Sequence, residues 1–123
     1  MFFGTASFAV PALRALTAAG HQVELVVTQP DRPAHRLQMT APAVKLAAQE
    51  LGLRLFQPER LRAEQAVSRI AAAMPDLLVV AAYGQIVPAS VLSVPTSCSL
   101  NVHASLLPRW RGAAPIAYAI REG

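Results

Sequence analysis

An asparagine and a histidine two positions apart are the residues of this sequence whose types and spacing best suit chemistry. Asn101 and His103 end an apolar stretch that has the composition of a buried strand. Alternate residues of a strand project to the same side of a sheet, so we expect the two side chains to lie together. An amide can donate a hydrogen bond to a developing oxyanion, and an imidazole can move a proton. The pair would therefore suit the tetrahedral intermediate of an acyl transfer.

The same pair also has a simpler interpretation. An asparagine often ends a strand, and a histidine beside it can hydrogen-bond to the backbone alone. The residues that follow favour chemistry, because "ASLLPRWRGAAP" contains two arginines, a tryptophan and two prolines, which is more than a turn requires.

Other kinds of site lack the residues that they need. The first turn from strand to helix contains Gly4 but no G-x-G-x-x-G, and no G-x-x-x-x-G-K-[ST] occurs, which disfavours dinucleotide and triphosphate binding. None of His21, His35 and His103 has a second ligand at metal spacing, and Cys98 is expected to face the core. We therefore expect neither a metal site nor a Cys-His nucleophile.

Alternating strands and helices are expected to position these residues. Strands are predicted at 1–5, 23–28, 53–56, 76–84 and 97–102, and helices at 7–20, 42–52, 58–73 and 88–92, with a proline-rich loop at 29–42. This order is typical of an α/β fold with a doubly wound, mostly parallel sheet and right-handed crossovers. Ligands of such sheets bind beyond the carboxyl ends of the strands, where Asn101 and His103 lie. The very short first strand and the helix at the end of the chain predict a sheet that is incomplete at both ends.

Side-chain patterns make the elements more specific. Phe8, Leu13 and Leu16 form an apolar stripe on the first helix, with Ser7 as its N-cap and Gly20 as its stop. The stretch 77–83 is apolar throughout, which is typical of a strand covered on both faces. The strand at 97–102 is expected to be buried as well.

Composition limits the class of protein. The 123 residues are 54% hydrophobic and 15% charged, which favours one folded domain over a disordered chain. The longest apolar run is far shorter than the roughly 20 residues of a membrane-spanning helix, and no basic residue precedes the apolar start as it does in a secretory signal. The single cysteine, Cys98, cannot form an internal disulfide. We therefore expect a cytoplasmic protein that does not bind membranes.

The charge allows an anionic partner. The formal net charge is +4, and Lys45 is the only lysine among 11 basic residues. Arginine binds phosphate and carboxylate in a bidentate manner, which favours such a partner. A solvated surface in a protein whose genome prefers arginine codons explains the same numbers equally well.

Six segments together give the sequence a family likeness: "FFGT", "FAVPAL", "VVTQPDRPA", "FQPERL", "PDLLVVAAYGQIVP" and "NVHASLLPRWRGAAPI". The whole chain resembles the N-terminal domain of the methionyl-tRNA formyltransferase family. Asn-x-His followed by Ser-Leu-Leu-Pro is common to folate-dependent formyltransferases, whereas "TQPDRPA" and "RWRGAAPI" are specific to the tRNA enzymes. The resemblance implies a partial, Rossmann-like formyltransferase domain at 1–123, without the C-terminal barrel domain of the family.

The resemblance also implies a reaction, in which the formyl group of 10-formyltetrahydrofolate passes to the amino group of methionyl initiator tRNA for translation initiation. Asn101 would hold the formyl oxygen, and His103 would stabilise the tetrahedral adduct and move a proton from the amine to the leaving nitrogen. No metal is implied. The pocket for the folate donor would be formed by Tyr83, Gly84, Gln85, Ile86, Val87, Ser105, Leu106, Leu107 and Pro108. Without the resemblance, 83–88 is a glycine-containing turn before a helix.

The proline-rich loop matches the family loop that enters the acceptor end of the tRNA. The family has glycines on both sides of the arginine at position 36 and two lysines after it, whereas this chain has His35, Leu37 and Gln38. Fewer positive charges weaken contact with phosphate, and a rigid surface loop without a ligand is the alternative. Contacts with tRNA are implied for Arg32, Arg36, Arg109 and Arg111.

The third catalytic residue of the family is an aspartate a few dozen residues beyond the histidine. Neither Asp31, in the proline-rich loop, nor Asp76, at the start of a strand, is placed to substitute for it. We therefore expect little or no formyl transfer by these 123 residues alone, and a monomer when the protein is intact. Two alternatives remain open: a formyltransferase for a sugar-nucleotide or purine-precursor amine, and a non-catalytic module that binds folate or an anion.

Overall fold

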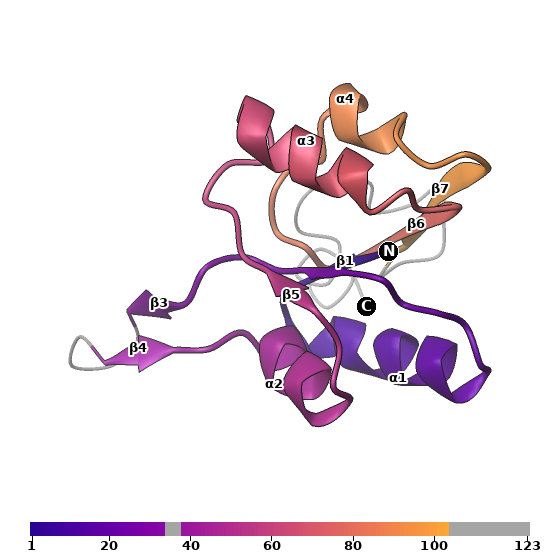
Figure 1. Ribbon diagram of the computed structural model, residues 1–123. Coiled ribbons are helices and arrows are strands. Elements are labelled where there is room, and N and C mark those ends of the chain that lie inside the picture. Colours follow the sequence, from indigo (N-terminus) through magenta and orange to yellow (C-terminus); the bar gives the residue numbers. More distant parts are fainter. Residues whose placement is uncertain (34–37, 104–123) are drawn as a thin grey trace, which may run out of the picture.

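A five-stranded parallel sheet forms the centre of the protein. The computed structural model describes residues 1–33 and 38–103 (Figure 1). The strand order is β5-β2-β1-β6-β7, and every neighbouring pair is parallel, so all five carboxyl ends meet at one edge. The predicted α/β fold with a parallel sheet is confirmed. The strands are β1 (Phe2–Gly4), β2 (Val26–Val27), β5 (Leu55–Phe56), β6 (Leu77–Ala81) and β7 (Cys98–Val102).

Helices cover both faces of this sheet (Figure 1). The helices α1 (Val10–Ala18) and α2 (Ala43–Glu50) lie on one face, and α3 (Glu64–Ala72) and α4 (Ala89–Leu92) lie on the other. Successive side chains of β1 point to opposite faces of the sheet, which divides the core in two. Phe2 packs with Leu13 and Val44 on one face. Phe3 packs with Ile70 and Val91 on the other. Each face thus buries its own hydrophobic cluster, as expected for a doubly wound sheet.

The ends of the first helix agree only in part with prediction. Gly20 follows α1 with a φ of 86°, and Gly52 follows α2 with a φ of 69°, so glycine ends both helices as predicted. Ser7 is not an N-cap, because a 3-10 turn at Ser7–Ala9 precedes α1 and no side chain caps either start. Pro11 lies in the first turn of α1 and has no N–H to satisfy, which lowers the need for a cap. Phe8 belongs to that 3-10 turn and is 40% exposed, so the predicted stripe begins only at Leu13.

The proline-rich loop is a small hairpin. Its strands β3 (Arg32–Pro33) and β4 (Met39–Thr40) pair antiparallel and project away from the main sheet (Figure 1). Both strands are exposed and only two residues long, so no run of alternating apolar residues in the sequence indicates them. The helix predicted at 58–73 begins only at Glu64, because the preceding turn is used to bury Leu61 in the core.

The last strand is more exposed than predicted. Leu100 is 52% exposed, Val102 is 41% exposed, and Cys98 lies at the surface rather than in the core. The reason is position, since β7 ends the described sheet and pairs there with β6 alone. In β6, Leu78 and Ala81 are fully buried, but Leu77 next to the edge is 38% exposed. None of the helices within 1–33 and 38–103 is long and apolar enough to cross a membrane.

Candidate active site

The site lies where the strand order changes direction. The chain runs from β1 outward to β2 and β5 on one side, and from β6 outward to β7 on the other. In open α/β sheets, ligands bind at this point, beyond the carboxyl ends of the strands. The residues that leave β1 and β6 meet here, because Thr5 N–H and Ala6 N–H both donate to the Ala82 carbonyl, at 3.0 and 3.3 Å.

The turn after β6 is tightly held. Ala82 has a φ of 47° and Gly84 a φ of 91°, so two residues of this turn adopt the left-handed conformation that an alanine rarely takes. The Tyr83 carbonyl between them accepts hydrogen bonds from Thr5 Oγ1 at 2.6 Å and from Gln29 Nε2 at 2.8 Å. These contacts fix the backbone of the predicted donor-binding loop against β1 and the residues after β2.

Tyr83 can offer only its backbone to a ligand. Its side chain is 2% exposed and packs edge-on against Phe3, with ring centroids 5.6 Å apart. Burial raises the pKa of the phenol to about 12, and the hydroxyl has no hydrogen-bond partner among the described residues. Ile86, by contrast, is 84% exposed, and Gly84 is also at the surface. An apolar side chain and a stretch of backbone are thus exposed at this edge of the sheet.

The predicted catalytic pair lies beside this turn. In the register of β6 and β7, Asn101 is opposite Val80 and Val102 is opposite Ala81. Asn101 is exposed and His103, one residue beyond the strand, is half-buried. Ser99 shares the face of Asn101, and its hydroxyl donates to the Leu92 carbonyl at 2.8 Å, which identifies this face as the one that α4 covers. The mutual orientation of Asn101 and His103 stays a prediction.

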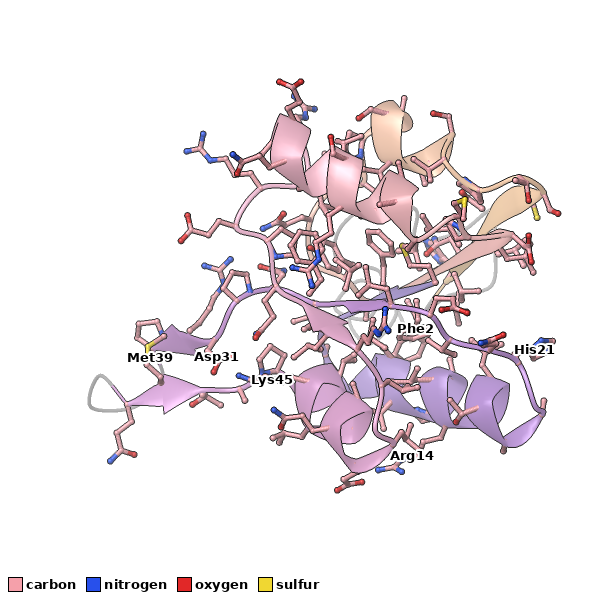
Figure 2. All side chains as sticks on the ribbon, viewed as in Figure 1. Phe2, Arg14, His21, Asp31, Met39 and Lys45 are labelled. Atoms are coloured by element: carbon pink, nitrogen blue, oxygen red, sulfur yellow. The ribbon has the colours of Figure 1, made fainter. Side chains whose placement is uncertain are left out.

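An ion pair joins the hairpin to α2. Lys45 Nζ lies 2.9 Å from Asp31 Oδ2, and Gln57 Nε2 donates to Asp31 Oδ1 at 2.8 Å (Figure 2). The bonds from Gln57 and Lys45 hold the pKa of the Asp31 carboxyl below its usual value. Asp31 is thus held by Lys45 and Gln57, and Asp76 lies at the opposite edge, where its backbone carbonyl accepts from Ser97 N–H at 2.9 Å.

Two hollows flank this edge. One of about 330 Å³ lies at the base of the hairpin and includes Thr5, Gln29 and Arg32. The other, of about 470 Å³, lies between β5 and α3, and in it the Arg69 guanidinium stands 4.4 Å above the Phe56 ring. Within the part of the chain that the structure describes, no three His, Cys, Asp or Glu side chains gather closely enough to hold a metal ion.

Comparison with known proteins identifies the family. Residues 1–123 match the family model described as formyl transferase. The chain belongs to the formyl transferase family. It is 58% identical to a methionyl-tRNA formyltransferase of Neisseria meningitidis serogroup C and 57% identical to one of Methylobacillus flagellatus. The matches cover this entire chain but only 41% and 40% of those relatives, so the chain spans about two fifths of their length.

Solved structures confirm the fold of this formyl transferase chain. A phosphoribosylglycinamide formyltransferase from Bacillus halodurans superposes with a TM-score of 0.74 at 21% identity, over 99% of this chain and 64% of that one. A glycinamide ribonucleotide transformylase 1 from Geobacillus kaustophilus gives 0.70 at 24% identity, over 99% and 66%. At such identities, the likeness concerns the fold alone.

Several of the residues predicted for the site lie at one edge of the sheet. The structure brings 83–87 and Asn101 to the carboxyl ends of neighbouring strands, with His103 directly after Val102. Arg32 is exposed on the hairpin and reaches this region through Gln29 Oε1, to which its Nη2 donates at 2.6 Å. The other predicted residues lie outside the described ranges: Arg36, Ser105, Leu106, Leu107, Pro108, Arg109 and Arg111.

Sequence reasoning did not find three polar residues that hold the site together. Thr5 follows β1 directly, Gln29 lies two residues after β2, and Gln57 follows β5. Their common signal is a polar residue at the carboxyl end of a strand in a parallel sheet. The same signal holds for every strand of the sheet and not for the last strand alone.

Proposed function

We propose that this chain carries the donor-binding loop and two catalytic residues of a methionyl-tRNA formyltransferase. The observation that carries the proposal is the parallel register of β6 and β7, which sets Asn101 beside the strand that leads into the 82–87 turn. The 58% identity to a methionyl-tRNA formyltransferase, against 21% for a phosphoribosylglycinamide formyltransferase of the same fold, favours an aminoacyl-tRNA acceptor over a purine precursor. Because charged initiator tRNA is cytoplasmic, the proposal places the protein there.

The mechanism follows from what the residues can donate. 10-Formyltetrahydrofolate supplies an activated formyl group, whose bond to nitrogen breaks as a new bond forms to the methionyl amine. Asn101 would donate its amide N–H to the formyl oxygen, where negative charge develops. His103 would take the proton that the amine loses and return it to the departing nitrogen of the folate.

Donor binding would depend mainly on the backbone of the turn after β6. The two hydrogen bonds on the Tyr83 carbonyl hold this turn in place. Gly84 and Ile86 are exposed there and would contact the pterin. Arg32, exposed on the hairpin, would contact the phosphates of the acceptor end, as its charge and position favour.

The test is a formylation assay of the whole protein as its gene encodes it, with methionyl initiator tRNA and 10-formyltetrahydrofolate. Replacing Asn101 or His103 with alanine is expected to lower kcat/KM by roughly 100-fold or more, because each would act only in the transition state. His21→Ala is the matched control, since His21 is exposed at the end of α1, on the opposite side of the molecule from Asp31 and Met39 (Figure 2). Retention of activity by both alanine variants would remove the proposed catalytic roles.

The acceptor is tested with the same enzyme. Methionyl initiator tRNA is expected to be formylated, whereas uncharged tRNA and glycinamide ribonucleotide are not. Faster formylation of the small amine would assign the protein to the purine-precursor alternative. Binding of a folate analogue without transfer to any acceptor would favour a non-catalytic module.

A further inference from the structure

We propose that Gln29 is a positioning residue that sets the backbone of the Tyr83–Gln85 turn and connects it to Arg32 of the hairpin. The proposal rests on the function proposed above, because it assigns the turn to the donor and the hairpin to the acceptor. Gln29 lies at the carboxyl end of the sheet, two residues after β2, and is half-buried. It would act through the turn and touch neither reacting group.

The main chain of Gln29 is anchored on both sides. Its N–H donates to Thr5 Oγ1 at 3.3 Å, and its carbonyl accepts from Gln57 Nε2 at 3.1 Å. Thr5 follows β1 and Gln57 follows β5, so the backbone of Gln29 is held by residues after the two strands that flank β2. The side chain therefore starts from a fixed point at the edge of the sheet.

The amide nitrogen of Gln29 determines the position of the turn. It donates to the Tyr83 carbonyl at 2.8 Å, beside the bond of 2.6 Å from Thr5 Oγ1, so both lone pairs of that carbonyl are used. A Cβ added at Gly84 would lie 2.3 Å from the same nitrogen. The side chain of Gln29 thus occupies the space that a side chain at position 84 would need, and the two residues are complementary in shape.

The amide oxygen of Gln29 faces the hairpin. It accepts from Arg32 Nη2 at 2.6 Å and from Gln85 Nε2 at 3.5 Å. Only one orientation of the amide satisfies this arrangement, because a flip would put its oxygen against the Tyr83 carbonyl and its NH₂ against the Arg32 guanidinium. One side chain thereby fixes the hairpin and the turn with respect to each other.

Replacing Gln29 with glutamate separates the effect of its contact with Tyr83 from the effect of its contact with Arg32. In Gln29→Glu, the carboxylate still accepts from Arg32, but it cannot donate to the Tyr83 carbonyl and repels it. Gln29→Leu removes the hydrogen bonds with Tyr83, Arg32 and Gln85 without the repulsion. Both variants lose the neutral hydrogen bond to the Tyr83 carbonyl, and only Gln29→Glu sets a second acceptor against that carbonyl. We therefore expect the KM for the folate donor to rise about tenfold in Gln29→Glu and about threefold in Gln29→Leu. In Gln29→Glu, kcat and the KM for tRNA should stay within about threefold of wild type.

The control is Gln49→Glu, the same change at an exposed position near the end of α2. It adds the same charge and should leave both KM values as they are. An unchanged donor KM in both Gln29 variants would overturn the proposal. So would a fall in kcat at constant KM, because that result indicates a smaller folded fraction and not a displaced turn.

A binding measurement separates this proposal from the proposed function. Calorimetric titration with 5-deazatetrahydrofolate, which carries no formyl group, is expected to show the same order of affinity: wild type, then Gln29→Leu, then Gln29→Glu. If the affinities of the three proteins for the analogue follow this order but the wild-type protein formylates no acceptor, the proposed function fails and the role of Gln29 stands. If the wild-type protein formylates tRNA and the three affinities are equal, the role of Gln29 fails alone. Absence of analogue binding to the wild-type protein refutes both.

Discussion

Replacing Gly84 with alanine tests the contact between Gln29 and the Tyr83–Gln85 turn. The measured quantity is the loss in the free energy of unfolding. Two effects act at this position. An alanine at a φ of 91° costs roughly 1–2 kcal/mol, because its Cβ approaches the carbonyl that follows it. That Cβ would also lie 2.3 Å from Gln29 Nε2, so the glutamine must leave the Tyr83 carbonyl and lose a hydrogen bond of about 0.5–1.5 kcal/mol. The expected loss in the free energy of unfolding is therefore about 1.5–3.5 kcal/mol.

Gly20 provides the matched control for this change. Its φ of 86° is nearly the same, but a Cβ there would have no atom within 4 Å. Gly20→Ala should thus cost only the conformational part, roughly 1–2 kcal/mol. The gain from a less flexible unfolded chain is common to both substitutions and cancels in the difference.

The assay is urea denaturation of both variants, followed by circular dichroism. Gly84→Ala should unfold at the lower urea concentration, by an amount that corresponds to about 0.5–1.5 kcal/mol beyond Gly20→Ala. In a Gln29→Ala background the clash is absent, so Gly84→Ala should then cost no more than Gly20→Ala. Equal costs of the two alanine substitutions in the wild-type background would refute the reasoning.

Two further predictions concern titrating groups. Tyr83→Phe removes a buried hydroxyl that has no partner among the described residues, so stability at neutral pH should stay the same or rise by up to about 1 kcal/mol. Because the pKa of Tyr83 is raised from 10.0 to about 12, this phenol ionises first in the unfolded chain as the pH rises. In thermal unfolding, wild type should therefore lose stability between pH 10 and 12, and Tyr83→Phe should not show this loss. The pKa of Asp31 is lowered from 3.8 by its bonds to Gln57 and Lys45, so its contribution is complete above that pH and is lost as the pH falls through the folded value. Urea midpoints of wild type and Asp31→Asn should therefore differ at pH 7 and converge in acid, and a constant gap would contradict this role of the carboxylate.

The sequence predicted those elements whose signal is local. The continuous apolar run at 77–83 gave β6, and glycines marked the ends of α1 and α2, because a left-handed residue after a helix is a local requirement. The exposure of β7 was not predictable in this way, since an apolar composition is the same for a central strand and for one at the edge of a sheet. The hairpin of β3 and β4 was missed because two-residue strands carry no period.

The candidate site was predictable to the same extent. Asn101 and His103 are close in sequence, so their spacing and the segment that follows them indicated a site, and the family resemblance implied their roles, which stay a prediction. Gln29 and Tyr83 are 54 residues apart, and their contact exists only because β2, β1 and β6 are neighbours in the sheet. Strand order is decided by the packing of the whole domain, and no short segment of sequence specifies it.

The backbone N–H groups of the two residues after β1 are not free to bind an anion. In nucleotide-binding relatives of the doubly wound sheet, free N–H groups at the first turn hold a pyrophosphate. Here the N–H groups of Thr5 and Ala6 are already engaged by the Ala82 carbonyl. A Cβ at Gly4 would lie 2.8 Å from the Phe2 ring and 2.9 Å from the Ala81 carbonyl, so this glycine allows close packing at the end of β1. The residues that follow β1 thus hold the turn after β6 in place, and the N–H groups of Thr5 and Ala6 are not free to bind a phosphate.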